Sequence, residues 1–475
     1  MLDEQAIRRR VAEAGQEHVF RFWDRLDAEG RRRLLGQLAE IDLDRLAELI
    51  ERHVIHPKPF ALPEDLRPAP FIPLPRTEAD HAERRRMRRL GEDLLASGKV
   101  AAMTVAGGQG TRLGWQGPKG TFPVGPVSGR SLFQVFAEGI LAARRAYGAT
   151  IPWFIMTSEA NDAATRAFFA EHDYFGLPPE DVRFFRQGTM PAVDFEGRLI
   201  LEAPDRLALS PDGHGGALRA LERSGALAEM ADRGIEHISY FQVDNPLVPP
   251  LDPVFLGYHV SAASEMSSKM VRKRDPEEKL GHFCLAGGRL VVIEYIDMPR
   301  ELAEAREADG RLRFEAGSIA IHILARRFVE RLTRGGRLAL PFHRAVKKVP
   351  YADADGQTRI PDEPNGIKFE QFIFDALPLA ENPIVLEIDR AEEFSPVKNA
   401  EGEDSPATAR RDMVRRAARM LEAAGVTVPR DPQGEPAVRV EISPLAARTV
   451  EELRDLCARR GISAIEADTY IGPEP

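Results

Sequence analysis

Glycines alternate with an arginine and a lysine in one stretch of the chain, from Val105 to Gly120, which reads VAGGQGTRLGWQGPKG. The stretch follows an apolar run, Val100 to Val105, that predicts a buried strand, so we expect it to leave the carboxyl end of that strand as a loop. Glycines let backbone N–H groups approach a ligand closely. Arg112 and Lys119 add two cations. Such a loop is suited to holding a polyphosphate.

Two familiar phosphate-binding loops do not match this stretch. The dinucleotide pattern G-x-G-x-x-G, started at Gly108 and Gly110, needs glycine where Leu113 stands. The pattern G-x-x-x-x-G-K-[ST] needs glycine before its lysine, whereas Lys119 follows Pro118. Glycines alone are also typical of tight turns, but the interleaved cations favour a phosphate site.

Composition limits the class of protein. A chain of 475 residues predicts two or three domains, and 43% hydrophobic with 29% charged residues is typical of a soluble globular protein. A net charge of −9 argues against a nucleic-acid partner. Cys284 and Cys457 are too few for a disulfide framework or a metal cluster. With no signal-like or membrane-spanning apolar run, we expect a cytoplasmic protein with no membrane partner.

The order of elements predicts an α/β core behind a helical start. Apolar residues at helical spacing indicate helices up to about residue 53, seven prolines between 57 and 75 indicate an extended connector, and a helix follows over 78–97. Its RRRMRR run is interpreted as a solvated face. Ser131 and Gln134 predict a capping box, and Gly148 predicts the end of that helix. The later elements expected are strand 151–157, helix 160–171, strand 182–186, a hairpin turning near 196–197, helix 215–231, strand 238–243, helix 408–424, strand 437–442 and helix 450–460.

The sequence resembles the UDP-sugar pyrophosphorylase (type 1 UDPGP) family, most closely its UDP-N-acetylhexosamine branch. The family's signature GGQGTRLG…PKG stands at residues 107–114 and 118–120. Further matching blocks follow in order over roughly residues 20–410: PWFIMTSE, FFxxHDYFGL, QGTMPAV, SPDGHGG, QVDNPLV, VKKVPY, PNGIKFEQFIFD and EEFSPVKNA.

The resemblance implies an α/β fold with a central mixed, mainly parallel sheet of nucleotidyltransferase type (glycosyltransferase-A-like, Rossmann-like). We expect a helical N-terminal region over 1–97 that includes the proline-rich connector, a catalytic domain over 98–400, and a small C-terminal α+β domain over 401–475. The implied reaction joins UTP and a sugar 1-phosphate into a UDP-sugar and pyrophosphate.

The resemblance also assigns the catalytic groups. Arg112 and Lys119 are expected at the β- and γ-phosphates, while Lys398 and then Lys368 contact the α-phosphate or the sugar phosphate. Asp244, at the end of an expected strand, matches the aspartate that binds the divalent ion, for which Mg²⁺ is the natural choice. A lysine or strand-end aspartate taken alone would be a surface charge or a turn former.

The remaining implied contacts concern the nucleotide and the sugar. The nucleotide-binding set is Ala106, Gly107, Gly108, Gln109, Gly110, Thr111, Gln187 and Gly213, and the sugar-binding set is His214, Glu294, Glu315 and Gly317. Gln187 could instead cap a strand, and Glu294 could be an ordinary strand residue. His214 stands where the N-acetylhexosamine branch usually has asparagine, and Glu315 where the family has an NAGN block.

Several alternatives stay open at this point. N-acetylglucosamine 1-phosphate is the first substrate expected, with glucose 1-phosphate or a broad sugar range second. A glycosyltransferase would need a D-x-D pair, which Asp244-Asn245-Pro246 lacks. A non-catalytic UDP-sugar-binding protein would have little use for the cations. A monomer is expected because the C-terminal tail is short for the family, with a dimer left open.

Overall fold

The structure, a computed structural model, describes residues 3–57, 60–336 and 338–473. The chain divides into two compact units. Unit 1 is built from residues 1–61, 187–219 and 338–375, and unit 2 from residues 62–186, 220–337 and 376–475. Of the expected proline-rich connector, Lys58 and Pro59 lie outside the described residues. The described remainder contains no helix, makes a turn at 63–66 and includes the short strand β1 (Arg67–Pro68).

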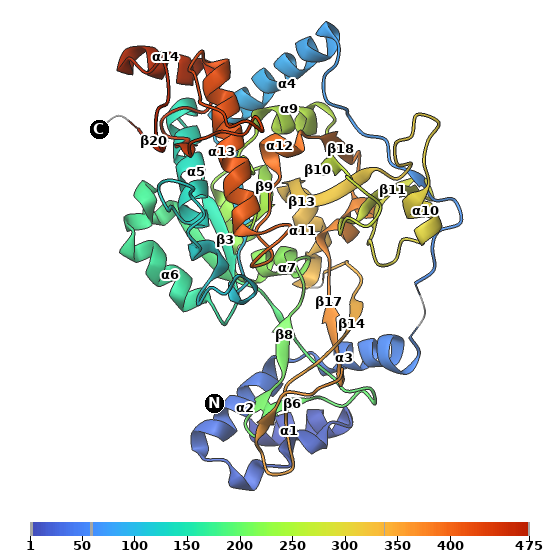
Figure 1. Cartoon of the computed structure of the whole chain (residues 1–475). Helices are drawn as coiled ribbons and strands as arrows, with labels where there is room; N and C mark the ends of the chain where they lie inside the picture. Colours follow the sequence, from blue (N-terminus) through green and yellow to red (C-terminus); the bar gives the residue numbers. More distant parts are fainter. Residues whose placement is uncertain (1–2, 58–59, 337, 474–475) are drawn as a thin grey trace. The chain divides into compact units, whose positions relative to one another are not determined.

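Unit 2 contains a mixed ten-stranded sheet, as the sequence predicts (Figure 1). Its parallel half has the order β9 (His237–Gln242), β2 (Val100–Val105), β3 (Trp153–Thr157) and β4 (Val182–Arg186). The other half continues from β9 through antiparallel β13 (Ala316–Ala325) to β10 (Met266–Arg272) and β11 (His282–Ala286), with β12 (Arg289–Ile293) and β1 beside β11, and β18 (Ile384–Glu387) parallel to β10. Strands β2 and β9 are neighbours, so the segments that follow them leave the same edge of the sheet.

The helices of unit 2 begin and end largely where local signals place them. α4 (Glu78–Ala96) has a full capping box, and α5 (Leu132–Tyr147) ends at Gly148 with φ of +62°. The capping box expected at Ser131 is only half formed, because the Gln134 amide bonds Glu138 instead of the Ser131 backbone. The prediction of a single helix over 215–231 is wrong, because Gly225, in the left-handed conformation, separates two helices. These are α7 (Gly216–Arg223), whose first four residues belong to unit 1, and α8 (Ala226–Asp232). The remaining helices include α6 (Asp162–Glu171), α9 (Pro253–Ser261), α10 (Arg300–Glu304), α11 (Arg326–Leu332) and α12 (Arg390–Glu393).

Unit 1 gathers the N-terminal helices around short strands from two later parts of the chain. Its elements are α1 (Glu4–Glu13), α2 (Ala28–Glu40), α3 (Leu43–Ile50), β5 (Thr189–Pro191), β6 (Leu201–Ala203), β7 (Arg206–Leu207), β8 (Leu209–Pro211), β14 (His343–Lys347), β15 (Tyr351–Ala352), β16 (Thr358–Arg359) and β17 (Gly366–Glu370). Apolar residues of the N-terminal stretch, among them Phe22, Leu34 and Leu46, are buried in its core. Leu34 and Leu46 lie on α-helices as expected, whereas Phe22 lies in a turn between two short 3-10 helices. The hairpin expected near residue 197 is present, with Gly197 at φ of +82°.

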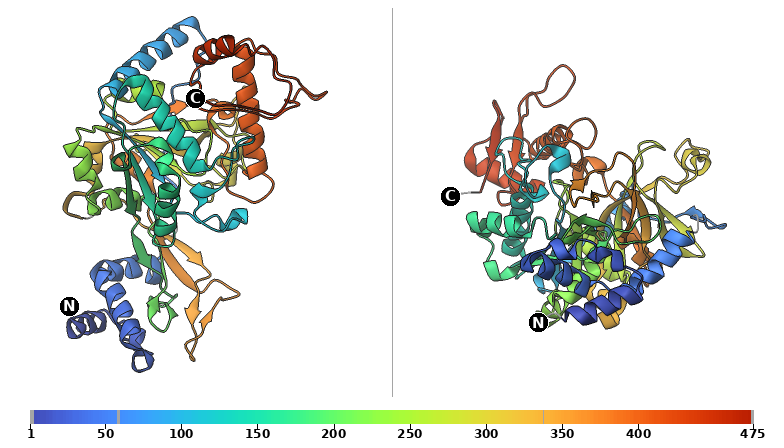
Figure 2. Two further views of the ribbon diagram at one scale, coloured as in Figure 1. Left: turned by 90° about the vertical axis from the view of Figure 1, so that its left-hand side faces the viewer. Right: turned by 90° about the horizontal axis from the view of Figure 1, so that it is seen from below.

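The C-terminal segment, residues 405–471, has a hydrophobic core of its own within unit 2. It contains α13 (Pro406–Ala423), β19 (Val440–Ile442), α14 (Val450–Arg460) and β20 (Thr469–Ile471), with β19 and β20 paired in parallel. The helices expected from the sequence here are confirmed. Figure 2 shows the segment, in red, from two further sides. Over the whole described part of the chain, none of the helices combines the length and apolar character that crossing a membrane requires.

A buried histidine in the antiparallel half of the sheet is held neutral. The side chain of His282 is 1% exposed, its Nδ1 lies 3.0 Å from the carbonyl of Phe314, and its Nε2 lies 2.9 Å from the Lys273 ammonium. Lys273 can only donate, so Nε2 accepts and Nδ1 carries the proton. Burial first, and the Lys273 charge second, lower the pKa of His282 to about 4.

This lowered pKa predicts acid sensitivity. The histidine of the unfolded chain titrates near pH 6.5. The folding stability that the neutral, buried His282 ring contributes is therefore fully present above that pH and is lost as the pH falls towards 4. We expect His282→Gln to lose less unfolding free energy between pH 7 and pH 5 than the wild type, by up to about 2 kcal/mol. Urea unfolding at both pH values measures this. His81→Gln, at an exposed histidine, is the control. An identical pH dependence in His282→Gln and the wild type would contradict the prediction.

Candidate functional site

The glycine-rich loop leaves the carboxyl end of β2 and is closed by its own backbone. The N–H of Gly110 donates to the carbonyl of Gly117 (2.9 Å), and the N–H of Lys119 donates to that of Gly108 (3.1 Å). Across the described ranges, the N–H groups of Gly107, Gly108 and Gln109 donate to no protein acceptor. Three successive backbone N–H groups without a protein acceptor at a strand end are the kind of arrangement that binds anions in proteins.

Side-chain packing fixes the shape of this loop. Trp115 lies against Gly110, where an added Cβ would be 2.7 Å from the Trp115 Cβ, and its indole N–H donates to Thr121 Oγ1 at 2.9 Å. A Cβ on Gly120 would lie 2.2 Å from the ring of Phe133. These glycines are therefore required by close packing and not only by the ligand.

An asparagine that sequence reasoning did not single out anchors the start of the loop. Asn161, 1% exposed at the beginning of α6, donates from its amide to the carbonyls of Ala106 (2.9 Å) and Gly108 (3.2 Å). Its amide oxygen accepts the N–H of Ser158 at 2.8 Å. Gln109 adds a bond to the carbonyl of Ala160 at 3.0 Å. The loop thus enters from β2 in a defined direction.

Lys119 and Asp244, predicted from separate motifs, meet in the structure. The Lys119 Nζ lies 3.2 Å from the Asp244 Oδ2, and the two side chains are 16% and 17% exposed. Asp244 follows β9, the strand next to β2. Partial exposure leaves both groups accessible to a ligand, and the ion pair holds each in place.

The segment that carries Lys398 is attached to the same strand end. The N–H of Val397 donates to the carbonyl of Asp244 at 2.8 Å. Asn245 donates from its amide to the carbonyl of Glu393 (2.7 Å), and its amide oxygen accepts the N–H of Ser395 (3.1 Å). Lys398 is 40% exposed, with its Nζ 3.6 Å from the Asp404 Oδ2. Asn245 therefore explains why an asparagine follows the aspartate in the QVDN motif.

Arg112 lies in the short 3-10 helix Thr111–Leu113 of the glycine loop and is exposed. Among the residues that the structure describes, it takes part in no hydrogen bond or ion pair. Its guanidinium is therefore available to an anionic ligand beside the loop.

Four predicted residues lie in unit 1. The Gln187 amide donates to the carbonyl of Gly213 at 2.9 Å, which ties two members of the predicted nucleotide set together. Gly213 has φ of +85°, and an added Cβ would lie 2.3 Å from the carbonyl oxygen of Gln371, so only glycine fits. Lys368 lies on β17, with partial exposure.

His214 is the fourth of these residues, and its environment fixes its tautomer. Its Nδ1 accepts the N–H of Ile373 at 3.2 Å, and its ring stacks on Phe372 at 5.4 Å between centroids. Burial, with a smaller contribution from His343, lowers the pKa of His214 to about 4. At neutral pH the imidazole is uncharged and carries its proton on Nε2, so it can donate one hydrogen bond.

The other predicted sugar residues lie in the antiparallel half of the unit 2 sheet. Glu315 is 13% exposed and pairs with Arg272 and with Arg311, the latter at 3.3 Å. Gly317 packs so closely that an added Cβ would be 2.9 Å from Leu280 Cδ1. Glu294 follows β12, and its carbonyl accepts the N–H groups of Asp297 and Met298. Glu315 is thus held by arginines, a partnership that its sequence position did not reveal.

A buried lysine near the strand end also escaped sequence reasoning. Lys269, on β10, is 1% exposed, and its ammonium is shared by Asp252 (2.6 Å) and Glu393. The Glu393 carbonyl also accepts a hydrogen bond from the Asn245 amide, so Lys269 helps to hold the segment that leads to Lys398. The available signal was a lysine in the middle of the strand MSSKMVR, whose first six residues are all buried.

Comparison with known proteins places the chain in a family. A family model described as UTP--glucose-1-phosphate uridylyltransferase (UDPGP) matches residues 73–405. The chain belongs to the UDPGP family. It is therefore a nucleotidyltransferase, as the sequence motifs predict. It is 41% identical to the UDP-N-acetylhexosamine pyrophosphorylase-like protein 1 of Homo sapiens, over 95% of this chain and 94% of that one.

Further members of the UDPGP family support this placement. The UDP-N-acetylglucosamine pyrophosphorylase of Saccharomyces cerevisiae is 38% identical, over 88% of this chain and 91% of the yeast protein. The crystal structure of the UDP-N-acetylglucosamine pyrophosphorylase of Trypanosoma brucei superposes with a TM-score of 0.81 at 27% identity, covering 100% of this chain and 99% of that one. The fold is therefore that of this family over the whole chain.

The contacts of Asn245 generate a prediction about the strand end. Its side chain is 5% exposed, and truncation would leave the Glu393 carbonyl and the Ser395 N–H without their partner. We expect Asn245→Ala to lower the free energy of unfolding by about 1 to 3 kcal/mol and to speed amide exchange over 393–398. Urea unfolding and hydrogen exchange measure this. Asn382→Gly, at an exposed asparagine with one long bond and a φ of +49° that glycine tolerates, is the control. Wild-type exchange over 393–398 would contradict the anchoring role.

Proposed function

We propose that this UDPGP-family chain forms UDP-N-acetylglucosamine and pyrophosphate from UTP and N-acetylglucosamine 1-phosphate. The observation that carries the proposal is the ion pair between Lys119 and Asp244, 3.2 Å apart. It puts a cation and a carboxylate beside the open backbone donors of the glycine loop. That combination suits a polyphosphate bound together with a divalent ion.

The chemistry requires positive charge more than a base. A sugar 1-phosphate oxygen is already an anion at neutral pH, so it can attack the α-phosphorus of UTP without losing a proton. Charge grows on the departing pyrophosphate. We assign Lys119 and Arg112 to that leaving group, with the N–H groups of residues 107–109 holding the same phosphates. Lys398, on the segment fixed to Asp244, is assigned to the sugar phosphate or the α-phosphate, and Lys368 stays a second choice.

Asp244 fits one magnesium ion of this reaction. Mg²⁺ is held by one or two carboxylates together with substrate phosphates and waters. Within the described residues, no group of three or more His, Cys, Asp or Glu side chains is placed to hold a metal ion. A single carboxylate needs substrate oxygens to complete the shell, which agrees with an ion that arrives with UTP. Bound there, Mg²⁺ would neutralise charge on the phosphates.

Uridine and sugar recognition remain predictions from the motifs. Gln187 and Gly213 are assigned to the uracil, because an amide can both donate and accept there. N-acetylglucosamine 1-phosphate comes first as the sugar because relatives at 38% to 41% identity carry N-acetylhexosamine or N-acetylglucosamine in their names. Glucose 1-phosphate comes second, because His214 stands where the N-acetylhexosamine branch usually has asparagine and Glu315 where the family has an NAGN block.

A substrate panel tests the proposed reaction. The protein is incubated with UTP, Mg²⁺ and one sugar 1-phosphate, and the pyrophosphate released is measured. The three sugar 1-phosphates compared are those of N-acetylglucosamine, N-acetylgalactosamine and glucose. We expect release only when a sugar phosphate is present and fastest with N-acetylglucosamine 1-phosphate. Faster release with glucose 1-phosphate would favour the second candidate. No release with any sugar phosphate would overturn the proposal.

The assigned role of Lys119 gives a second test. Lys119→Ala removes the leaving-group cation, so we expect kcat to fall by about 10²- to 10³-fold, or about 2 to 4 kcal/mol in the barrier, while UTP still binds. Steady-state kinetics and calorimetric titration with UTP measure the two quantities. Lys99→Ala is the matched control, because Lys99 lies beside the other end of β2 in an exposed pair with Glu236 (2.9 Å). Normal turnover by Lys119→Ala would refute the assignment.

A further inference from the structure

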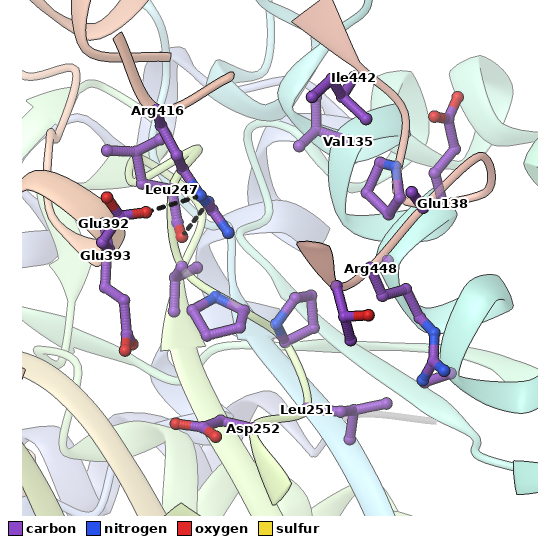
Figure 3. A pocket seen from close by; sticks show the side chains of 18 of the residues that line it. Val135, Glu138, Leu247, Leu251, Asp252, Glu392, Glu393, Arg416, Ile442 and Arg448 are labelled. Atoms are coloured by element: carbon purple, nitrogen blue, oxygen red, sulfur yellow. Dashed lines mark hydrogen bonds and ion pairs between the residues drawn. The ribbon is translucent and has the colours of Figure 1, made fainter. Parts of the chain in front are cut away.

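A pocket lies between the C-terminal segment and the rest of unit 2. The pocket has a volume of about 390 Å³ and is lined by α5, by the loop 246–254 and by α13 and the residues around β19. Figure 3 shows Arg416 of the segment at the pocket wall, where it donates to the carbonyl of Leu247 (3.0 Å) and pairs with Glu392 (3.7 Å). Apolar residues of α13, Ala409 and Met413, pack into the main core of unit 2, and separate polar links hold the segment around the pocket.

One of these links runs from β19 to the loop that follows the Lys119 motif. The Glu441 carboxylate accepts the N–H groups of Val127 (2.9 Å) and Ser128 (2.8 Å) and the hydroxyl of Ser128 (2.6 Å). The Glu441 side chain is buried, at 7% exposure. A Cβ on Gly125 would lie 2.9 Å from Glu441 Oε1, so the chain is closely wrapped around the carboxylate. Three donors on one buried acid make a charge-assisted anchor.

Three further contacts hold the same stretch, residues 122–131. Arg410 of α13 donates to the carbonyl of Pro123 at 2.6 Å, and its guanidinium lies 5.6 Å from the ring centre of Phe122. Arg439, next to β19, donates to the carbonyl of Pro126 at 3.3 Å. The C-terminal segment therefore holds this stretch along its length and not at one point.

The anchored stretch is continuous with the catalytic lysine. The N–H of Phe122 donates to the carbonyl of Lys119 at 3.1 Å, and Phe122 packs edge-on against Trp115 at 5.6 Å between ring centroids. Trp115 in turn fills the space beside Gly110. Because Phe122 is hydrogen-bonded to Lys119, three residues earlier, a displacement of residues 122–131 would also displace the Lys119 backbone.

We infer that Glu441 is a positioning residue, which sets the Lys119 ammonium by clamping the loop 122–131 from the C-terminal segment. The inference deepens the proposed function and rests on it for its effect on rate. A carboxylate is required because all three partners donate. The two N–H groups share Oε2 and the Ser128 hydroxyl bonds Oε1, so glutamine could keep its oxygen at the N–H groups, but its NH₂ would face Ser128 Oγ. The hydroxyl hydrogen would then lose its acceptor, and the negative charge that strengthens all three bonds would be removed.

Kinetics of Glu441→Gln test the inference. We expect kcat to fall by about 10- to 100-fold with the KM for UTP changed less than threefold, because a small misplacement costs rate more than binding. Glu422→Gln, at an α13 glutamate paired with exposed Arg430, is the control and should retain wild-type kcat. Ser128→Ala removes the hydroxyl that donates to the Glu441 carboxylate, so this variant should also lower kcat. Wild-type kcat in Glu441→Gln would overturn the inference.

A double variant distinguishes a positioning role of Glu441 from a general structural defect. If Glu441 acts through Lys119, then Glu441→Gln should reduce the residual single-turnover rate of Lys119→Ala by less than twofold. A structural defect would reduce the rate by the same factor in both backgrounds, and that result would also overturn the inference.

Hydrogen exchange keeps the test independent of activity. In Glu441→Gln, amide exchange over 119–131 should speed up at least tenfold while exchange in β2 and β9 stays at the wild-type rate. Unchanged exchange over 119–131 would refute the clamp even if no sugar phosphate were turned over. Faster exchange in a protein that releases no pyrophosphate would instead retain the clamp and reject the proposed reaction.

Discussion

Hydrogen bonds at the end of β9 join three segments that are far apart in the sequence. Asp244 receives the Lys119 ammonium on its carboxylate and the Val397 N–H on its carbonyl, while Asn245 holds the backbone around residues 393–395. The rest of the site depends on this junction. Anionic reactants repel one another, and cations lower the barrier only when they are already in place. A parallel pair, β2 and β9, makes this possible because both strands end at one edge.

The loop that offers backbone donors is held in place by contacts from several parts of the chain. Asn161 binds its start, Trp115 fills its centre, and Phe133 leaves room only for glycine at position 120. A donor group that is fixed before the ligand arrives loses little conformational entropy on binding. The glycines therefore have two physical causes: close approach of the backbone to a ligand, and close packing of the loop against aromatic rings.

Agreement between sequence and structure differs from element to element. The expected α5 and α14 and the strand β4 end within a residue or two of the observed bounds, because Ser131, Gly148 and Thr449 give local start and stop signals. The helix expected over 215–231 is interrupted at Gly225, whose left-handed backbone breaks an otherwise continuous apolar pattern. Glu315 was expected at the sugar, but nothing in its neighbourhood along the chain indicated its pairing with Arg272.

The sequence by itself determined the family motifs, the α/β class, the glycine loop after a buried strand, and the residue types from which the cations and the carboxylate had to come. These follow from local spacing and composition, which neighbouring residues in the chain express directly. Only the tertiary structure decided that Lys119 meets Asp244, that Asn245 fastens the Lys398 segment, and that Glu441 reaches back over three hundred positions to Val127 and Ser128. Such contacts depend on strand order and on packing between distant segments, which no local pattern encodes.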